Sequence, residues 1–337
     1  MDYLLFIPII VSFLVTLFLM PYWIRKAKQI GLFWDDMNKT GIQKVAGSGG
    51  IIAILGFIIG VLIYVAYRTF YLKIPNGYLV EIFALLCSVL ILAGIGIIDD
   101  LLGWQHGGLS RRSRIIMVLF ASIPLVVINA GDSLISLPFI GDVSLGLIYP
   151  LILVPLAIVG VTTTFNFLAG FNGLEAGQGI LLILAATLVA FFTGNAWLSV
   201  VGICMVLSLL AFLLFNFSPA RVFPGDSLTY AVGGLFAIMT ILGNFEKIAL
   251  FFFIPYIIEV ILKSRGKLVK QSFGKPNPDG SLSMRYDKVY GLTHLGIYLL
   301  DKIGIKPTEK KVVYLIWAFQ LVIIVIGFLI FRKGIFL

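Results

Sequence analysis

The sequence predicts an all-α, polytopic membrane protein with about ten transmembrane helices. Hydrophobic residues make up 60% of its 337 positions, and the mean hydropathy is +1.07. Apolar runs recur along the chain, each near the roughly 20 residues that a helix needs to cross a bilayer. The basic residues are also unevenly divided between alternate loops. These three observations favour a single integral membrane domain over residues 1–337.

The ten predicted spans are taken in chain order. They lie at residues 3–24, 46–67, 78–98, 115–130, 147–165, 174–193, 197–216, 228–244, 247–264 and 313–332. The first has neither a basic segment before it nor a small-residue cleavage site, so we expect a span and not a removable signal peptide. Cys87 and Cys204 fall inside spans without a metal-ligand or disulfide pattern, which favours a packing role.

The loops on one face hold 20 of the 25 Lys and Arg residues. Because basic loops stay on the cytoplasmic side, both termini are expected on the non-cytoplasmic side. The same rule places residues 264–312, between the ninth and tenth spans, as a cytoplasmic loop or lid. Its Asn277-Pro278-Asp279-Gly280 stretch predicts a hairpin turn. The loop bias accounts for most of the net charge of +9, so that charge does not indicate nucleic-acid binding.

Glycines and acids follow the first and third spans. The Gly47-Ser48-Gly49-Gly50 run opens the second span, either as an anion site or as close packing, and packing is slightly favoured. Asp99 and Asp100 end the third span, where carboxylates oppose the helix dipole, so solvation alone is a weak reason for them. Arg111, Arg112 and Arg114 could contact lipid headgroups or clamp phosphate.

The stretch from Asn166 to Gly179 interrupts two apolar runs with Asn, Glu, Gln and Gly. Polar, irregular backbone at membrane depth is tolerated only where protein or water satisfies it. It is either a short polar hairpin or a set of ligands for a charged substrate, and the second interpretation is favoured. Asp226 could cap the eighth span, or it could join Asp99, Asp100 and Asn166 around Mg²⁺. Glu259 is expected to form an ordinary helix pair with Lys263.

The motifs together resemble the polyprenyl-phosphate N-acetylhexosamine-1-phosphate transferase superfamily, most closely its eukaryotic and archaeal dolichyl-phosphate N-acetylglucosamine-1-phosphotransferases. The resemblance rests on Asn166-Phe-Leu-Ala-Gly-Phe-Asn-Gly-Leu-Glu-Ala-Gly-Gln178 and Arg221-Val-Phe-Pro-Gly-Asp226, with Asp99-Asp100 and Asp36-Met-Asn-Lys39 in the same order. It implies ten helices and a cytoplasmic-face active site. The implied reaction transfers N-acetylhexosamine-1-phosphate, expected to be GlcNAc-1-phosphate, from a UDP-sugar to a polyprenyl or dolichyl phosphate. UMP leaves, and the product is the first lipid-linked sugar of a pathway such as N-glycosylation.

The resemblance also implies roles for individual residues. Asn166 and Asp226 would bind Mg²⁺, or Mn²⁺ in its place, and Asp99 and Asp100 would be the catalytic acids. The implied substrate-binding residues are Asn38, Lys39, Arg114, Asn172, Glu175, Phe223, Lys270 and Lys275. Among these, Asn172 and Phe223 match positions that bind uracil, and Arg114 matches one that meets phosphates. The sequence departs from the family at Gly47, Gly103 and Thr163, and its 270–275 segment lacks the family's basic cluster, which leaves sugar recognition open.

The implied partners are a UDP-N-acetylhexosamine, the polyprenyl or dolichyl phosphate and membrane lipids, with no nucleic acid; a homodimer is an open alternative to a monomer. The expected location is the plasma membrane, or the endoplasmic reticulum membrane in a eukaryote. Two alternatives stay open. One is a bacterial-type undecaprenyl-phosphate sugar-1-phosphate transferase for cell-wall or surface polysaccharide. The other is a secondary transporter, which the clustering of polar residues on one face disfavours.

Overall fold

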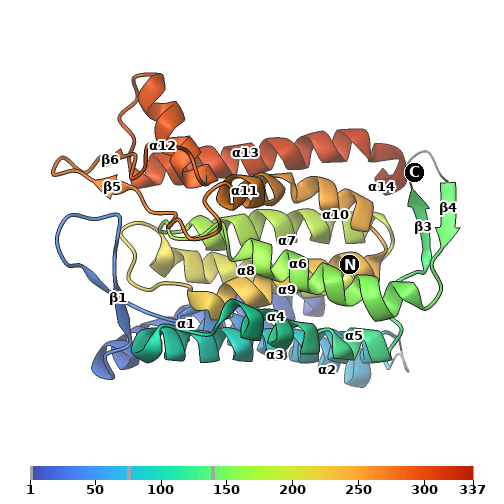
Figure 1. Ribbon diagram of the computed structural model, residues 1–337. Coiled ribbons are helices and arrows are strands. Elements are labelled where there is room, and N and C mark those ends of the chain that lie inside the picture. Colours follow the sequence, from blue (N-terminus) through green and yellow to red (C-terminus); the bar gives the residue numbers. More distant parts are fainter. Residues whose placement is uncertain (1–2, 74–76, 138–140, 337) are drawn as a thin grey trace.

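A computed structural model describes residues 3–73, 77–137 and 141–336 of the chain, which form a bundle of helices running side by side (Figure 1). The helices are α1 (Phe6–Gln29), α2 (Gly50–Ala66), α3 (Leu79–His106), α4 (Arg111–Phe120), α5 (Ile123–Val127), α6 (Val154–Phe165), α7 (Leu174–Phe192), α8 (Ala196–Asn216), α9 (Gly225–Gly243), α10 (Glu246–Phe252), α11 (Ile254–Ser264), α12 (Leu292–Lys302), α13 (Glu309–Ile330) and α14 (Arg332–Phe336). Within the described ranges, strands form three antiparallel pairs. They are β1 (Phe33–Asp35) with β2 (Lys44–Ala46), β3 (Leu134–Leu137) with β4 (Gly141–Ser144), and β5 (Lys275–Pro276) with β6 (Leu282–Ser283).

Seven helical segments in the described part of the chain are long and apolar enough to cross a membrane. They are Tyr3–Gln29, Gly50–Tyr71, Leu79–Trp104, Leu174–Phe192, Ala196–Asn216, Gly225–Gly243 and Glu309–Ile330. Each coincides with a predicted span. The chain is thus a helical integral membrane protein with seven candidate spans.

The other three predicted spans are shorter or interrupted. Residues 115–130 are divided between α4 and α5, and Pro124 lies in the first turn of α5. Residues 247–264 are divided between α10 and α11, with Pro255 just after the break. Proline lacks a backbone N–H and clashes with the preceding turn, so a helix breaks before it. Residues 147–165 form one shorter apolar helix, Tyr149–Phe165.

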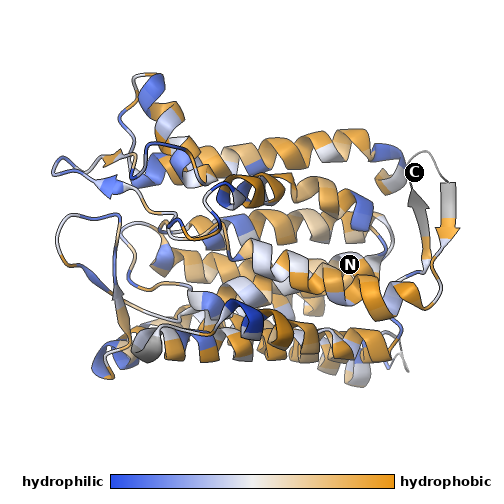
Figure 2. Cartoon of the chain, viewed as in Figure 1, coloured by the Kyte–Doolittle hydropathy of each residue, from blue (hydrophilic) through white to orange (hydrophobic). Residues whose placement is uncertain are grey.

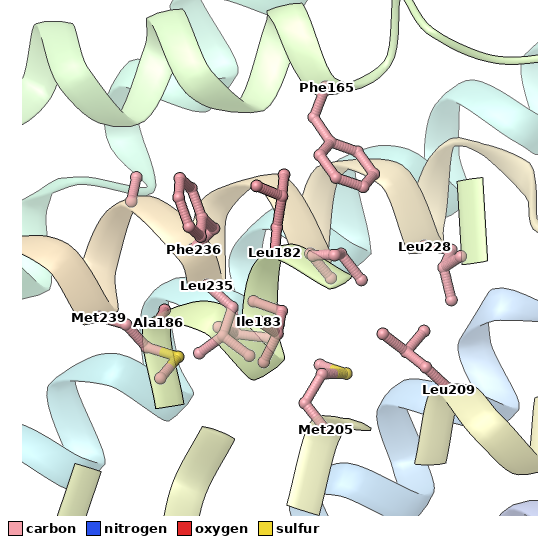
Figure 3. Close-up of a cluster of buried hydrophobic side chains, with 14 of the residues drawn as sticks. Phe165, Leu182, Ile183, Ala186, Met205, Leu209, Leu228, Leu235, Phe236 and Met239 are labelled. Carbon is pink, nitrogen blue, oxygen red and sulfur yellow. The ribbon is translucent and has the colours of Figure 1, made fainter. Parts of the chain in front are cut away.

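The centre of the bundle is α9, which packs against α3, α6 and α7. Side chains such as Phe165, Leu182, Leu209 and Phe236 interlock around it (Figure 3). Gly233 lets α6 approach closely, because a Cβ there would lie 2.7 Å from the Cβ of Phe165. Small residues are used this way in membrane bundles, where close packing drives helix association.

Hydrophilic residues gather at one end of the bundle, where β1, β5, β6 and α12 lie (Figure 2). We call this the polar end. The β3–β4 hairpin and α14 lie at the opposite end (Figure 1).

The segment between α11 and α13, residues 265–308, belongs to the polar end. Its predicted turn is confirmed, since the Gly280 N–H donates to Asn277 O and β5 pairs with β6. Glu259 forms the predicted pair with Lys263 (3.7 Å) and also accepts a hydrogen bond from the Leu292 N–H (2.6 Å) at the start of α12. The buried acid of α11 therefore anchors this segment to the bundle.

Candidate active site

A cavity of about 620 Å³ lies at the polar end and brings together most of the predicted site residues. Eight of them line it: Asp99, Asp100, Arg114, Asn166, Asn172, Glu175, Phe223 and Asp226. They come from α3, α4, α7, α9 and the loops that follow α6 and α8. Residues separated by more than 120 positions in the sequence thus line one cavity.

Asp99 is paired with Arg114 across a glycine turn. Its Oδ1 accepts hydrogen bonds from the Leu109 N–H (2.8 Å) and from Arg114 Nη2 (3.0 Å). The turn needs glycine, because Gly108 has φ +80° and an added Cβ would lie 2.9 Å from Asp99 Oδ1. The Arg114 side chain is only part buried and lines the cavity.

Asp100 has a different partner, as expected for helix neighbours that point about 100° apart. Its Oδ1 accepts from the Asp226 N–H (2.7 Å), so it caps the first turn of α9 from outside that helix. The prediction that α3 ends at these acids is wrong, since the helix continues to His106. The alternative that Asp226 caps its own helix is also wrong, because the N-cap is Pro224 and has no side-chain bond.

Asn166 and Asp226 both line the cavity, and Tyr230, one turn after Asp226, interacts with both. Asp226 lies close enough to Asp99 and Asp100 for their charges to interact, and Arg114 is the only basic residue among the described lining residues. This excess of carboxylate oxygens fits a hard divalent cation. No three His, Cys, Asp or Glu side chains in the described ranges are arranged as a metal site. Asp226 and Asn166 could supply one carboxylate and one amide oxygen to such a cation.

Phe223 lies on a loop that the glycine run holds in place. Its N–H donates to Ala46 O (2.8 Å), and its carbonyl accepts from the Gly49 N–H (2.9 Å). A Cβ on Gly50 would lie 2.5 Å from the Cβ of Leu228. The close-packing interpretation of the glycine run is confirmed, because its N–H groups are used within the protein.

The central motif supplies another part of the cavity lining. Gly170 and Gly173 have φ of +106° and +87°, conformations that other residues rarely adopt. Glu175 braces this turn, since its Oε1 accepts from the Gly170 N–H (2.8 Å). Asn172 is buried and donates from Nδ2 to Asp36 Oδ2 (2.8 Å).

The remaining four predicted residues lie outside this cavity. Asn38 bridges loops, donating to Gly170 O (2.8 Å) and accepting from the Gly274 N–H (3.1 Å). Lys39 forms an ion pair with Glu309. Lys270 stacks over Tyr286 with its Nζ 4.9 Å from the ring centroid. Lys275 is exposed on β5 and lines a neighbouring cavity. Their substrate-binding roles remain predictions.

Sequence reasoning missed several residues of this region. Asn216 is buried against the cavity, and its Oδ1 has no hydrogen-bond partner within the described ranges. Phe273 reaches the cavity from the 265–308 segment. Glu309 does not line this cavity but accepts a hydrogen bond from the backbone N–H of Asn172, which does. The Asp36–Lys39 motif indicated that the first loop takes part in the site. The sequence around Glu309 carries no such signal, because an acidic residue at the start of a helix is common.

The chain is similar to known proteins over most of its length. A family model described as glycosyl transferase family 4 matches residues 82–244. A protein of Saccharolobus solfataricus, provisionally named UDP-N-acetylglucosamine–dolichyl-phosphate N-acetylglucosaminephosphotransferase, is 32% identical over 323 residues, covering 95% of each chain. A Sulfolobus acidocaldarius protein with that provisional name is also 32% identical, over 95% of this chain and 94% of its own. The Dictyostelium discoideum protein of the same name is 31% identical over 77% of this chain and 70% of its own. The predicted resemblance is confirmed, and the chain belongs to glycosyl transferase family 4.

Proposed function

We propose that the chain transfers GlcNAc-1-phosphate from UDP-GlcNAc to dolichyl phosphate. The observation that carries this is the shared cavity at the polar end, where Asp99, Asp100, Asp226 and Arg114 meet at the edge of an apolar bundle. A lipid acceptor can stay in the bilayer while a nucleotide sugar enters from water. The names of the archaeal and Dictyostelium relatives point to the same donor and acceptor.

The proposed step is a phosphoryl transfer. An oxygen of the lipid phosphate attacks the phosphorus that bears the sugar, and the bond from that phosphorus to the UMP oxygen breaks. UMP leaves with the electron pair, and the lipid gains a pyrophosphate-linked sugar. Such reactions depend mainly on positioning and on neutralising charge. Arg114 would contact the phosphates, and Phe223 would lie against the base.

We also propose that Asn166 and Asp226 hold Mg²⁺, with Mn²⁺ as a substitute. The bound ion would neutralise the diphosphate and the leaving UMP. The support is the charge of the cavity: an anionic diphosphate would otherwise meet several carboxylates and one guanidinium. Asp99 would keep Arg114 oriented through their hydrogen bond.

Release of UMP is the direct test. Purified protein with UDP-GlcNAc, dolichyl phosphate and Mg²⁺ should release UMP and form a lipid carrying one GlcNAc and two phosphates by mass spectrometry. Asp226→Asn should abolish release, whereas Asp301→Asn, at an exposed position on α12, should not. UMP release without lipid phosphate, or none from the wild type, would contradict the proposal; a transporter would release none.

The membrane arrangement is a second part of the proposal. We propose that the broken helices α4–α5 and α10–α11 and the shorter helix Tyr149–Phe165 also cross the bilayer, which gives ten spans with the polar end in the cytoplasm. The start of α1 and the short helix α14 lie toward the β3–β4 end of the bundle, as an even number of spans requires (Figure 1). Lys288→Cys, at an exposed position, tests this. Labelling of this cysteine from outside intact cells by an impermeant reagent would contradict it.

A further inference from the structure

Glu309, the first residue of α13, is a buried carboxylate that collects donors from three loops. Its Oε1 accepts from the Asn172 N–H (2.9 Å), and its Oε2 accepts from Ser218 Oγ (3.1 Å). Lys39 supplies the counter-charge. A buried carboxylate is costly unless it is paired and its lone pairs are satisfied. Here both conditions are met, so the arrangement is a rigid one.

The side chain of Asn172 is oriented by two carboxylates. Its Nδ2 donates to Asp36 Oδ2 (2.8 Å) and to Glu309 Oε2 (3.3 Å). An amide nitrogen has two hydrogens, and both are committed in this way. The amide oxygen is then the polar atom that Asn172 can offer to a ligand in the cavity, which this residue lines.

We infer that Glu309 is a positioning residue for the nucleotide: it fixes the Asn172 amide so that an acceptor oxygen faces the base. The inference rests on the proposed function and deepens it. Glu309 itself lies behind the cavity wall and lines a neighbouring cavity of about 310 Å³, so it acts through Asn172 and not by touching the base.

The chemistry of the base follows from the acceptor. Uracil carries an N–H at position 3 that can donate to an amide oxygen. Cytosine carries a lone pair at that position, which an amide oxygen repels. A site with the amide held in this orientation should therefore favour UDP over CDP.

Glu309→Gln tests the inference directly. Glutamine keeps one acceptor oxygen but adds an NH₂ group to a place already surrounded by donors, so the amide of Asn172 loses its fixed orientation. We expect the Kd of UDP, measured by calorimetry without lipid, to rise about tenfold, since bonds to a charged group are among the stronger ones. The UDP-to-CDP preference should shrink with it. The KM for dolichyl phosphate should stay unchanged.

Ser218→Ala is the matched control. It removes one donor from the same carboxylate and leaves both Asn172 bonds, so UDP affinity should stay within about twofold of wild type, a change of about 0.4 kcal/mol. Asp36→Asn is the second test, because it removes the other carboxylate that holds the amide. It should shift UDP affinity and the UDP-to-CDP preference in the same direction as Glu309→Gln, and it decides the matter if Glu309→Gln fails to fold.

Two results would overturn the inference: wild-type UDP affinity and selectivity in a folded Glu309→Gln or Asp36→Asn variant, or an equal loss of UDP affinity in Ser218→Ala. The binding assay also separates this inference from the proposed function. A wild type that binds UDP but releases no UMP would contradict the function and still test Glu309. A wild type that binds no UDP would end both.

Discussion

The carboxylate of Asp100 accepts a hydrogen bond from the backbone N–H of Asp226, 126 residues away, at 2.7 Å. This bond joins α3, about two turns before its end, to the first turn of α9 and fixes the backbone position of Asp226. An external carboxylate at a helix N-terminus satisfies an orphan donor and complements the helix dipole. One of the two paired acids thus has a structural partner, and the other is paired with an arginine.

Substitutions at Asp100 should separate the capping hydrogen bond, which affects stability, from the negative charge, which affects UMP release. Asp100→Ala removes the acceptor and should lower the free energy of unfolding by about 1 kcal/mol, as for a lost cap. Asp100→Asn keeps an oxygen for the Asp226 N–H and should unfold near the wild-type temperature, measured in detergent. Both variants remove a charge from the cavity, and both should lose most UMP release. Equal destabilisation by the two variants would show that the cap is unimportant.

Gly225 should tolerate no side chain. It has φ +73°, and an added Cβ would collide with the Asp100 carboxylate. Gly194 has φ +85° but open space around it, so Gly194→Ala is a control for backbone strain alone. A left-handed conformation costs a non-glycine residue about 1–2 kcal/mol. We expect both variants to lose that stability, and only Gly225→Ala to lose UMP release more than about tenfold, the effect of a barrier raised by 1.4 kcal/mol. Normal turnover by Gly225→Ala would contradict the steric argument.

The convergence of the site could be predicted from the sequence because it depends on simple parity. Asp99 and Asn166 follow the third and fifth predicted spans and Asp226 precedes the eighth, so the ten-span prediction places all three on one side of the membrane. The predicted third span was placed correctly but ended too early. Helix α3 continues past Asp99 and Asp100, through further apolar residues such as Leu101 and Leu102, to His106 before the glycines at 107 and 108.

The contacts behind the site could not be predicted. The bonds from Asn172 to Asp36 and Glu309 join positions 136 and 137 residues apart. Nothing local marks such a pair, because a Glu at a helix start is common for dipole reasons alone. Similarly, the packing of Lys270 on Tyr286 depends on how the 265–308 segment folds back, which composition does not determine.

The 265–308 segment should loosen in acid through His294. This residue is buried on α12, with Nε2 3.3 Å from Phe273 O, and burial lowers the pKa of its imidazole below the usual 6.5. Lys263 and Arg285 add to the lowering. The unfolded segment therefore binds a proton first, so its stability is complete above about pH 6.5 and falls as the pH drops below that value.

Hydrogen exchange measures this effect. As the pH is lowered from 7.5 to 5.5, the backbone amides of Leu292–Lys302 should exchange increasingly faster in the wild type than in His294→Gln. The glutamine variant has no imidazole to protonate. Comparing the two proteins at the same pH removes the intrinsic pH dependence of exchange. A wild-type-to-variant ratio that does not change with pH would rule out His294 as the cause.

Phe223 should contribute to nucleotide binding through its ring. Its backbone is held at both the N–H and the carbonyl by the 46–49 segment, so a substitution of the side chain should leave the loop in place. Stacking of a base on an aromatic ring is worth roughly 1–3 kcal/mol. Phe223→Leu keeps apolar bulk and should therefore weaken UDP-GlcNAc binding by about 5- to 150-fold. The affinity for dolichyl phosphate should hardly change.

The control for Phe223→Leu is Phe18→Leu. Phe18 is 72% exposed on the apolar surface of α1, where a ring can contact lipid but no nucleotide. Its substitution should leave both substrate affinities unchanged. If Phe223→Leu binds UDP-GlcNAc like wild type and loses affinity for the lipid phosphate instead, Phe223 contacts the acceptor. The base would then lie against other residues of the cavity lining, such as Asn172 and Phe273.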